Sequence, residues 1–139
     1  MATRVVTTVV GDGNSGGGDG TGTNARVGSL EGLTLTSDDA MLYVAGGSPA
    51  HTIRAVRIGD MAVTTVAGSH NNPSFADGVH TSARFHTPAG VVLSPDNLIL
   101  YVSEAGGSSS HNRIRTIISW KPPSVPPPSP PPTSPPPPQ

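Results

Sequence analysis

Histidine and acidic side chains supply the groups in this sequence that are best suited to chemistry. His80 and His86 stand near Asp77, and imidazole with carboxylate is a usual combination for metal binding or acid–base catalysis. No nucleophile motif such as G-x-S-x-G occurs in the chain. The absence of cysteine excludes thiolate metal sites and disulfides. We therefore predict a protein that is not an enzyme, with no catalytic residues, no metal ligands and no cofactor.

The glycine-rich segment 16–22 is the other candidate for ligand binding. Phosphate binding would need a G-K-[S/T] ending or a following helix, and neither pattern is present. Asp12, Asn14 and Asp19 offer oxygen ligands for calcium, but their spacing fits no complete calcium loop and the bidentate glutamate is missing. The better interpretation is a flexible connecting loop.

Charge and hydropathy exclude two classes of partner. The formal net charge is −1, the arginines are scattered and Lys121 is the only lysine. The sequence therefore has no basic patch, and nucleic-acid binding is not predicted. The sequence contains no run of about 18 apolar residues, so a membrane span is not predicted. The first residues lack the apolar core of a secretory signal, and the sequence stops within a proline run. We expect a fragment whose true start is missing.

An internal repeat organises the chain as far as residue 121. A shift of 58 positions aligns 25–45 with 83–103, and eight of the 21 pairs are identical. A shift of 57 matches Val6–Gly11 with Val63–Gly68, and a shift of 61 matches Ile53-Arg54 with Ile114-Arg115. Repeats of this length are typical of proteins built from one small unit used several times.

Each repeat contains short β-type segments separated by turn residues. No apolar pattern with a helical period is present, so an all-β fold is expected. The predicted strands of the first unit are Leu33–Thr36, Met41–Ala45, Thr52–Ile58 and Ala62–Ala67. Those of the second unit are Gly90–Leu93, Ile99–Ser103 and Arg113–Ile118.

The second unit resembles an NHL repeat. The residues that carry the resemblance are Thr65–Gly68, Ala76–Gly78, Ala83–Phe85, Pro88–Val91, Leu100–Glu104 and Asn112–Arg115. The first unit departs from the pattern at Leu30, Gly46 and His51-Thr52. The resemblance implies β-propeller blades of NHL type, about two four-stranded antiparallel blades, in a domain 1–121 with units at about 5–61 and 62–120.

The resemblance also assigns structural roles to repeated residues. It places four side chains on central strands that pack between blades: Tyr43, Val44, Tyr101 and Val102. Gly32 and Gly90 would allow close backbone approach near the propeller axis. Arg54 and Arg115 would reach a carboxylate or loop carbonyls. The family's amidating lyases need a metal centre of histidines from several blades, which two blades cannot supply.

The second unit lacks a fourth strand, because the proline tail comes directly after its third and proline cannot supply ladder donors. The repeat assigns the missing strand to an unused N-terminal segment, formed by Val5, Val6, Thr7, Thr8, Val9 and Val10. Two blades cannot close a propeller of roughly 4–8 blades. We expect this assembly strand to complete the second blade of another copy, or to pair with flanking blades of a longer chain.

Residues 122–139 form a proline-rich tail, for which polyproline II is the expected conformation. Its Ser-(Pro)n pattern resembles hydroxyproline-rich glycoproteins of plant and green-algal walls and surfaces. The resemblance implies hydroxylation or O-linked glycans on Pro123, Pro126, Pro127, Pro128, Pro130, Pro131, Pro132, Pro135, Pro136, Pro137, Pro138, Ser124, Ser129 and Ser134. The rival interpretation is an intracellular ligand of SH3, WW or profilin domains.

These patterns together favour an extracellular structural glycoprotein of a cell wall or surface filament. Its blades would mediate self-assembly, and its glycosylated tail would act as spacer or sheath. One alternative is an NHL scaffold that recognises a peptide or glycan. The second is a fragment of a propeller enzyme.

Overall fold

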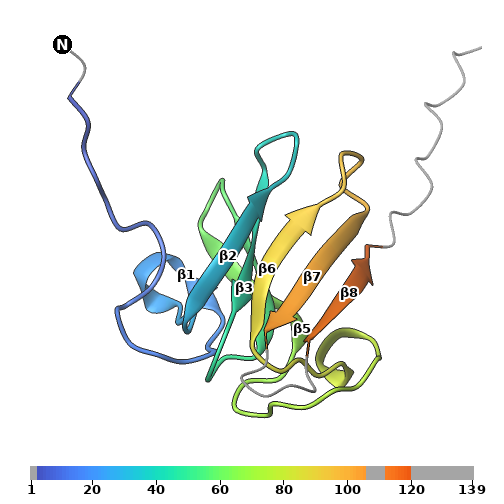
Figure 1. Cartoon of the computed structure of the whole chain (residues 1–139). Helices are drawn as coiled ribbons and strands as arrows, with labels where there is room; N and C mark the ends of the chain where they lie inside the picture. The colour runs from blue at the N-terminus through green and yellow to red at the C-terminus, as the bar shows by residue number, and fades with distance from the viewer. Residues whose placement is uncertain (1–2, 106–111, 120–139) are drawn as a thin grey trace, which may run out of the picture.

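A computed structural model describes residues 3–105 and 112–119 of the 139-residue chain. The described chain is all-β with almost no helix, and its strands form two antiparallel sheets (Figure 1). The first sheet runs in the order β1 (Gly20–Thr21), β5 (Ala62–Gly68), β4 (Thr52–Arg57), β3 (Met41–Gly46) and β2 (Leu30–Leu35). The second runs β6 (Pro88–Leu93), β7 (Ile99–Ala105) and β8 (Asn112–Ile118). Two single turns of 3-10 helix, η1 (Gly22–Asn24) and η2 (His80–Ser82), lie in the connections.

The seven predicted strands are confirmed as β2 to β8, and the repeat extends to the hydrogen bonds of their turns. In the β2–β3 turn, the Thr36 hydroxyl accepts from the Met41 amide at 3.0 Å, and Asp38 accepts from the Ala40 amide at 3.1 Å. Ser94 and Asp96 repeat both contacts in the β6–β7 turn. Side-chain oxygens in such turns satisfy amides that the ladder leaves unpaired, which explains why both units use these residue types.

The two sheets meet most closely where β2 lies against β6. Both strands have a register shift at the repeated glycine, between Leu30 and Gly32 and between Pro88 and Gly90. A Cβ atom on Gly32 would lie 2.7 Å from the Ala89 carbonyl oxygen, so only glycine allows this approach without a backbone shift. The predicted close approach is thus confirmed at Gly32. At Gly90 the near neighbour is instead the Ser103 side chain.

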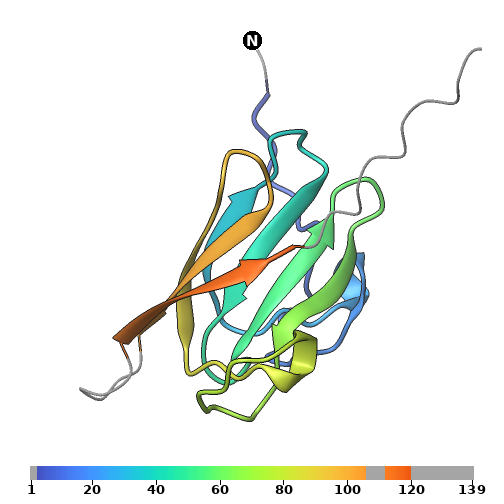
Figure 2. The ribbon, with the colours of Figure 1, turned by 90° about the vertical axis from the view of Figure 1, so that its right-hand side faces the viewer.

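The main core fills the space between the sheets, which Figure 2 shows lying one against the other. Ala45, Ile53 and Ala67 come from the first sheet and Leu100 and Val102 from the second. Ala83 and Phe85, from the connection between the sheets, complete this cluster. A second cluster covers the other face of the first sheet; its buried members are Ala25, Val27, Val44, Val56 and Val63. Alternation along each strand therefore gives the first sheet two apolar faces.

The repeated tyrosines, which were predicted to pack between blades, differ in their surroundings within the described chain. Tyr43 packs against the core between the sheets. Tyr101 is 41% exposed, while its neighbours Leu100 and Val102 on β7 are buried. Because side chains alternate along a strand, Tyr101 points to the outer face of the second sheet. Strands β6 and β7 cover Tyr43, but no sheet in the described part of the chain covers Tyr101 in the same way.

The assembly strand, Val5–Val10, does not belong to either sheet within the described residues. Val6 is 98% exposed, and Val5 and Val9 are also exposed. Its end contacts the fold, where Val10 packs against the second cluster. Figure 1 shows this segment leaving the molecule on the side opposite β8.

The predicted modification sites of the tail, from Pro123 to Pro138, lie outside the described residues. In the two described ranges, no helix is long and apolar enough to cross a membrane.

Candidate functional site

A groove of about 880 Å³ lies beside β8. One wall is β8, the opposite side is formed by Val66 and Ala67 of β5, and the loop that joins the sheets contributes the floor. Apolar lining comes from Phe75, Val79, Ala83, Phe85, Ile114, Ile117 and Ile118, and polar lining from Asp77, His80, Arg113, Arg115, Thr116 and Ser119. The groove therefore suits an extended segment with both apolar and polar side chains.

The free edge of β8 distinguishes the second sheet from the first. In the first sheet β4 is covered by β5, with Arg54 opposite Thr65 and Val56 opposite Val63. Within residues 3–105 and 112–119, β8 pairs only with β7. Among the described residues, the outer edge of β8 thus has no neighbouring strand, and such an edge is a template for another strand.

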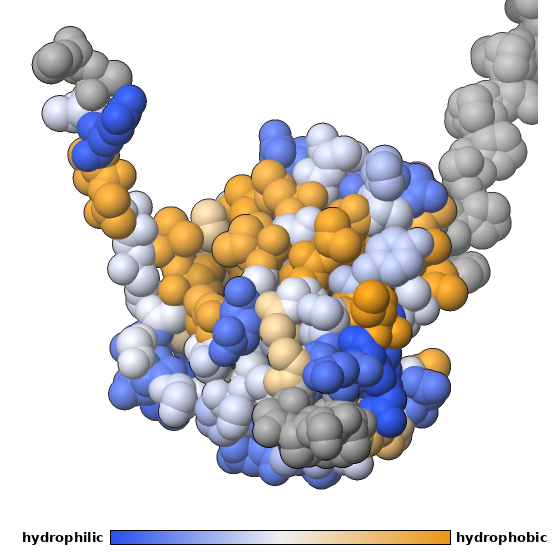
Figure 3. Space-filling model, in the orientation of Figure 1, coloured by the Kyte–Doolittle hydropathy of each residue, from blue (hydrophilic) through white to orange (hydrophobic). Residues whose placement is uncertain are grey.

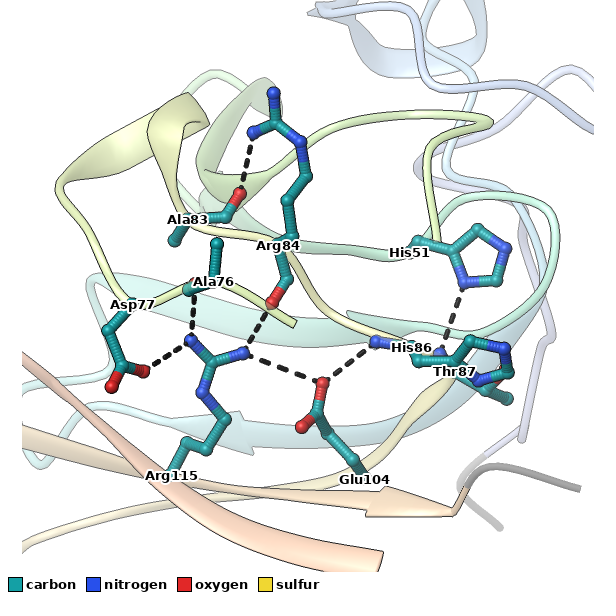
Figure 4. A network of polar contacts seen from close by, with 9 residues as sticks. All are labelled: His51, Ala76, Asp77, Ala83, Arg84, His86, Thr87, Glu104 and Arg115. Atoms are coloured by element: carbon teal, nitrogen blue, oxygen red, sulfur yellow. Dashed lines mark hydrogen bonds and ion pairs between the residues drawn. The ribbon is translucent and has the colours of Figure 1, made fainter. Parts of the chain in front are cut away.

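Arg115 organises a polar cluster at the base of this groove (Figure 4). Its guanidinium donates to the Ala76 carbonyl at 2.7 Å, to Asp77 at 2.8 Å and to the Arg84 carbonyl. It also lies 3.6 Å from a carboxylate oxygen of buried Glu104. This confirms that Arg115 reaches both a carboxylate and loop carbonyls. Several acceptors around one planar cation fix the loop against β8.

Arg54 makes the corresponding contacts in the first sheet. It donates to the Arg26 carbonyl at 3.1 Å and to Asp19 at 2.7 Å, which are the repeat equivalents of the Arg84 and Asp77 contacts. Arg54 is fully buried, and this burial lowers the pKa of its guanidinium, although Asp19 acts in the opposite direction. We call each arginine with its aspartate and loop carbonyl the arginine clamp of its sheet.

The two clamps differ in a hydroxyl group. In the first sheet, Thr65 of β5 donates to the same Asp19 oxygen at 3.0 Å, so the fourth strand closes the clamp. In the second sheet, Asp77 has a 99% exposed side chain and its described hydrogen bond comes from Arg115. Asp77 corresponds through the repeat to Asp19, which the fourth strand of the first sheet contacts.

The clamps also differ in Glu104, which stands where the first unit has Gly46. The Glu104 side chain is buried, and its Oε1 atom accepts from the His86 amide at 2.8 Å. Its Oε2 atom is buried with no hydrogen-bond partner among the described residues. A buried carboxylate needs a nearby cation, so Glu104 makes the second clamp more dependent on its arginine than the first.

Two histidines, His51 and His86, lie at a contact between the sheets. His51 is buried, accepts from the Thr87 amide at 3.1 Å through Nδ1, and lies 5.8 Å from His86 between ring centroids. Burial lowers the pKa of His51, and the neighbouring His86 and His70 lower it further. The neutral imidazole is therefore the form that the fold holds.

The aspartates among the ligand candidates suggested by the sequence are paired with arginines. Asp12 accepts from the Asn14 amide and pairs with Arg26, contacts that lower the pKa of Asp12 to about 2. Asp19 and Asp77 belong to the two clamps. His80 lines the groove from η2, whereas His86 stacks 6.3 Å from Phe75. No group of three metal-ligating side chains is present among the described residues.

Two further contacts were not predicted from the sequence. Glu104 shares a face of β7 with Leu100 and Val102, a spacing of two that places it towards the core. This alternation could have identified Glu104 as a buried acid in need of a cation. Arg113 lies 3.8 Å above the Phe75 ring, a cation–π contact that no local pattern indicates because it joins residues far apart in sequence.

Apolar side chains remain exposed on the outer face of each sheet. On the second sheet they are Val92, Tyr101, Ile114 and Ile118. On the first they are Leu30, Leu33 and Leu35, beside a hollow of about 210 Å³ that Val9, Val10 and Val27 also line. Figure 3 shows apolar surface gathered over β2 and the second sheet. Exposed apolar patches of this kind mark interaction surfaces.

No family model matches the sequence, and no curated protein matches it either. Among solved structures, a protein of unknown function from Bacteroides thetaiotaomicron matches 79% of this chain at 25% identity, with a TM-score of 0.62. An auxiliary nutrient binding protein from the same organism matches 68% at 24% identity, with a TM-score of 0.55. The aligned parts cover 24% and 25% of those two chains, so this chain spans about a quarter of their length.

Proposed function

We propose that this chain is an extracellular structural glycoprotein that assembles head to tail through incomplete NHL-type propeller blades. The observation that carries the proposal is the groove beside β8, which lacks a fourth strand, in a chain whose N-terminal segment repeats the sequence of β5. The assembly strand Val5–Val10 of one copy fills the groove of the next. The protein is a structural element and not an enzyme.

The sheet order supports the assignment of two blades. β2 to β5 form an antiparallel series of four sequential neighbours, and β6 to β8 repeat its first three. The sheets pack face to face with the first strand of each near the contact, as propeller blades do. The chain matches about a quarter of each longer solved chain. Two repeat units of a protein with more such units would give a match of this extent.

The apolar faces support head-to-tail stacking. Within the chain, the Tyr43 face of the first sheet packs on the Leu100 and Val102 face of the second. The Tyr101 face is the repeat equivalent of the Tyr43 face and is exposed. The next copy would cover it with the outer face of its first sheet, around Leu33. One such contact is heterologous, so it forms a ring if the rotation closes and a fibre if it does not.

A truncation series tests the assembly. Removing residues 1–8 deletes most of the assembly strand but retains Val10, which packs in the fold; removing residues 1–4 is the matched control. We expect the full chain and the shorter truncation to form large species by light scattering, and the longer truncation to be a folded monomer. A full chain that is already monomeric at high concentration would refute the proposal.

The tail supports the glycoprotein part of the proposal by its composition. Prolines in contiguous runs between Pro126 and Pro138, interrupted by Ser129 and by Thr133-Ser134, would carry hydroxyl groups and O-linked glycans. A stiff, glycosylated tail would sheathe the assembly in the cell wall or on the cell surface. The test is the mass of the tail peptide from the native source. An unmodified mass would favour an intracellular proline-rich ligand instead.

An NHL scaffold that binds an extended peptide of another protein is the alternative. The same groove favours it, because Arg113 and Arg115 line the wall with charge beside the apolar Phe85. A synthetic peptide with the sequence of residues 3–12 distinguishes the two. Binding of this peptide to the longer truncation supports self-assembly, and no binding favours a foreign ligand.

A further inference from the structure

We propose that Thr8 of one copy closes the arginine clamp of the next copy by donating its hydroxyl to Asp77. This inference rests on the proposed head-to-tail assembly and specifies its register. It makes Thr8 the residue that selects one alignment of the assembly strand on β8. The first sheet provides the template, because it holds the complete arrangement within one chain.

The register follows from transferring the β4–β5 pairing through the repeat. Arg54 lies opposite Thr65, Ala55 opposite Thr64 and Val56 opposite Val63. The shift of 61 for β4 and of 57 for β5 converts these pairs into three contacts between copies. They are Arg115 opposite Thr8, Thr116 opposite Thr7, and Ile117 opposite Val6.

The apolar contacts agree with this register. Val63 is 1% exposed and packs with Ala25 and Val56 in the second cluster. Their repeat equivalents, Ala83 and Ile117, line the groove beside β8. Val6, the equivalent of Val63, is 98% exposed in the single chain and would occupy this apolar part of the groove. A slip of one residue would turn Val6 to the other face and place Thr7 among apolar groups.

The polar contacts agree independently. The Thr65 hydroxyl donates to the Asp19 oxygen that Arg54 also contacts. Asp77 holds the same position relative to Arg115, at 2.8 Å, and its side chain is 99% exposed. In the transferred register the Thr8 hydroxyl replaces that of Thr65. A hydrogen bond to a charged acceptor adds specificity to an edge that the backbone alone would pair in several registers.

Replacing Thr8 with valine tests the hydroxyl without changing side-chain shape. We expect Thr8→Val to raise the dissociation constant for head-to-tail association roughly tenfold, because the variant loses a hydrogen bond to a charged acceptor. Thr3→Val, the same change outside the assembly strand, is the control. Asp77→Ala should abolish the difference between threonine and valine at position 8, which a general loss of strand propensity would not do.

Engineered cysteines test the register directly, because the natural chain has none. A copy with Thr7→Cys mixed with a copy with Thr116→Cys should form a disulfide-linked pair under mild oxidation. Pairing Thr7→Cys with Ile118→Cys, two positions away, should give little product. If the longer truncation abolishes assembly but Thr8→Val associates like the wild type, this inference is wrong and the proposed function survives. If the full chain does not associate, both are wrong.

Discussion

The two sheets use the same arginine clamp but finish it differently. In the first, Arg54 and Asp19 are joined by a threonine from the fourth strand of the same chain. In the second, Arg115 and Asp77 face an open groove, and a buried glutamate takes part instead. The comparison shows how a repeat keeps its internal contacts while its outer contacts depend on the neighbouring unit.

Removing Arg115 should have the largest effect on stability. Arg115→Met would leave Glu104 as a buried carboxylate without its cation, and uncompensated buried charges of this kind cost about 3–5 kcal/mol. Arg54→Met should cost less, about 1.5–3 kcal/mol, because its partner Asp19 is half exposed and can be hydrated. Urea unfolding of the monomeric truncation measures both.

A second substitution checks the cause of that difference. Glu104→Gln keeps an acceptor for the His86 amide but removes the charge. In the Arg115→Met background it should therefore recover part of the lost stability. An equal loss for Arg54→Met and Arg115→Met, with no recovery from Glu104→Gln, would show that the buried glutamate does not distinguish the clamps.

The repeated tyrosines should differ next most strongly. Tyr43→Ala removes a side chain that packs against the core between the sheets, and we expect a loss of about 2–4 kcal/mol in the monomer. Tyr101→Ala truncates a side chain that is 41% exposed and should cost about 1 kcal/mol or less. In the assembled chain the Tyr101 substitution should weaken association. Equal losses in the monomer would mean that the exposed face is already covered.

The strands were predictable because they depend on local pattern. The β-branched runs, the Thr36–Asp38 and Ser94–Asp96 turns and the repeated glycines each specify their own short segment. The sequence also predicted that Arg54 and Arg115 reach a carboxylate or loop carbonyls, since the repeat places both beside apolar neighbours on a strand. The acceptors they reach lie 28 to 39 positions away, too far for any local pattern to identify.

The orientation of Tyr101 could not be predicted from the sequence. An aromatic residue in an apolar strand is usually expected to be buried, and its repeat equivalent Tyr43 does contact the core. Which of two alternating faces is covered depends on what packs against the sheet, and the pattern of one strand does not specify this.

The smallest expected effect is a change in the pH dependence of stability at His51. This residue corresponds through the repeat to Asn112, which is exposed at the start of β8. His51 instead joins the two sheets, accepting from the Thr87 amide beside the His86 ring. Burial, followed by the charges of His86 and His70, lowers the pKa of His51 below its ordinary value of 6.5.

The sign depends on which state takes up the proton. Between the lowered pKa and 6.5, the unfolded chain binds a proton at His51 and the folded chain does not. The contribution of neutral His51 is therefore complete above 6.5 and is lost as the pH falls through the folded pKa. Protonation would also place a hydrogen on the Nδ1 atom that accepts from Thr87.

His51→Asn makes the first unit like the second and suits the positive φ of 51° at this position. Urea unfolding of the monomer from pH 8 to pH 5 should show a shallower loss of stability for the variant than for the wild type. Parallel curves would place the acid sensitivity elsewhere and would show that this contact between the sheets does not depend on a neutral imidazole.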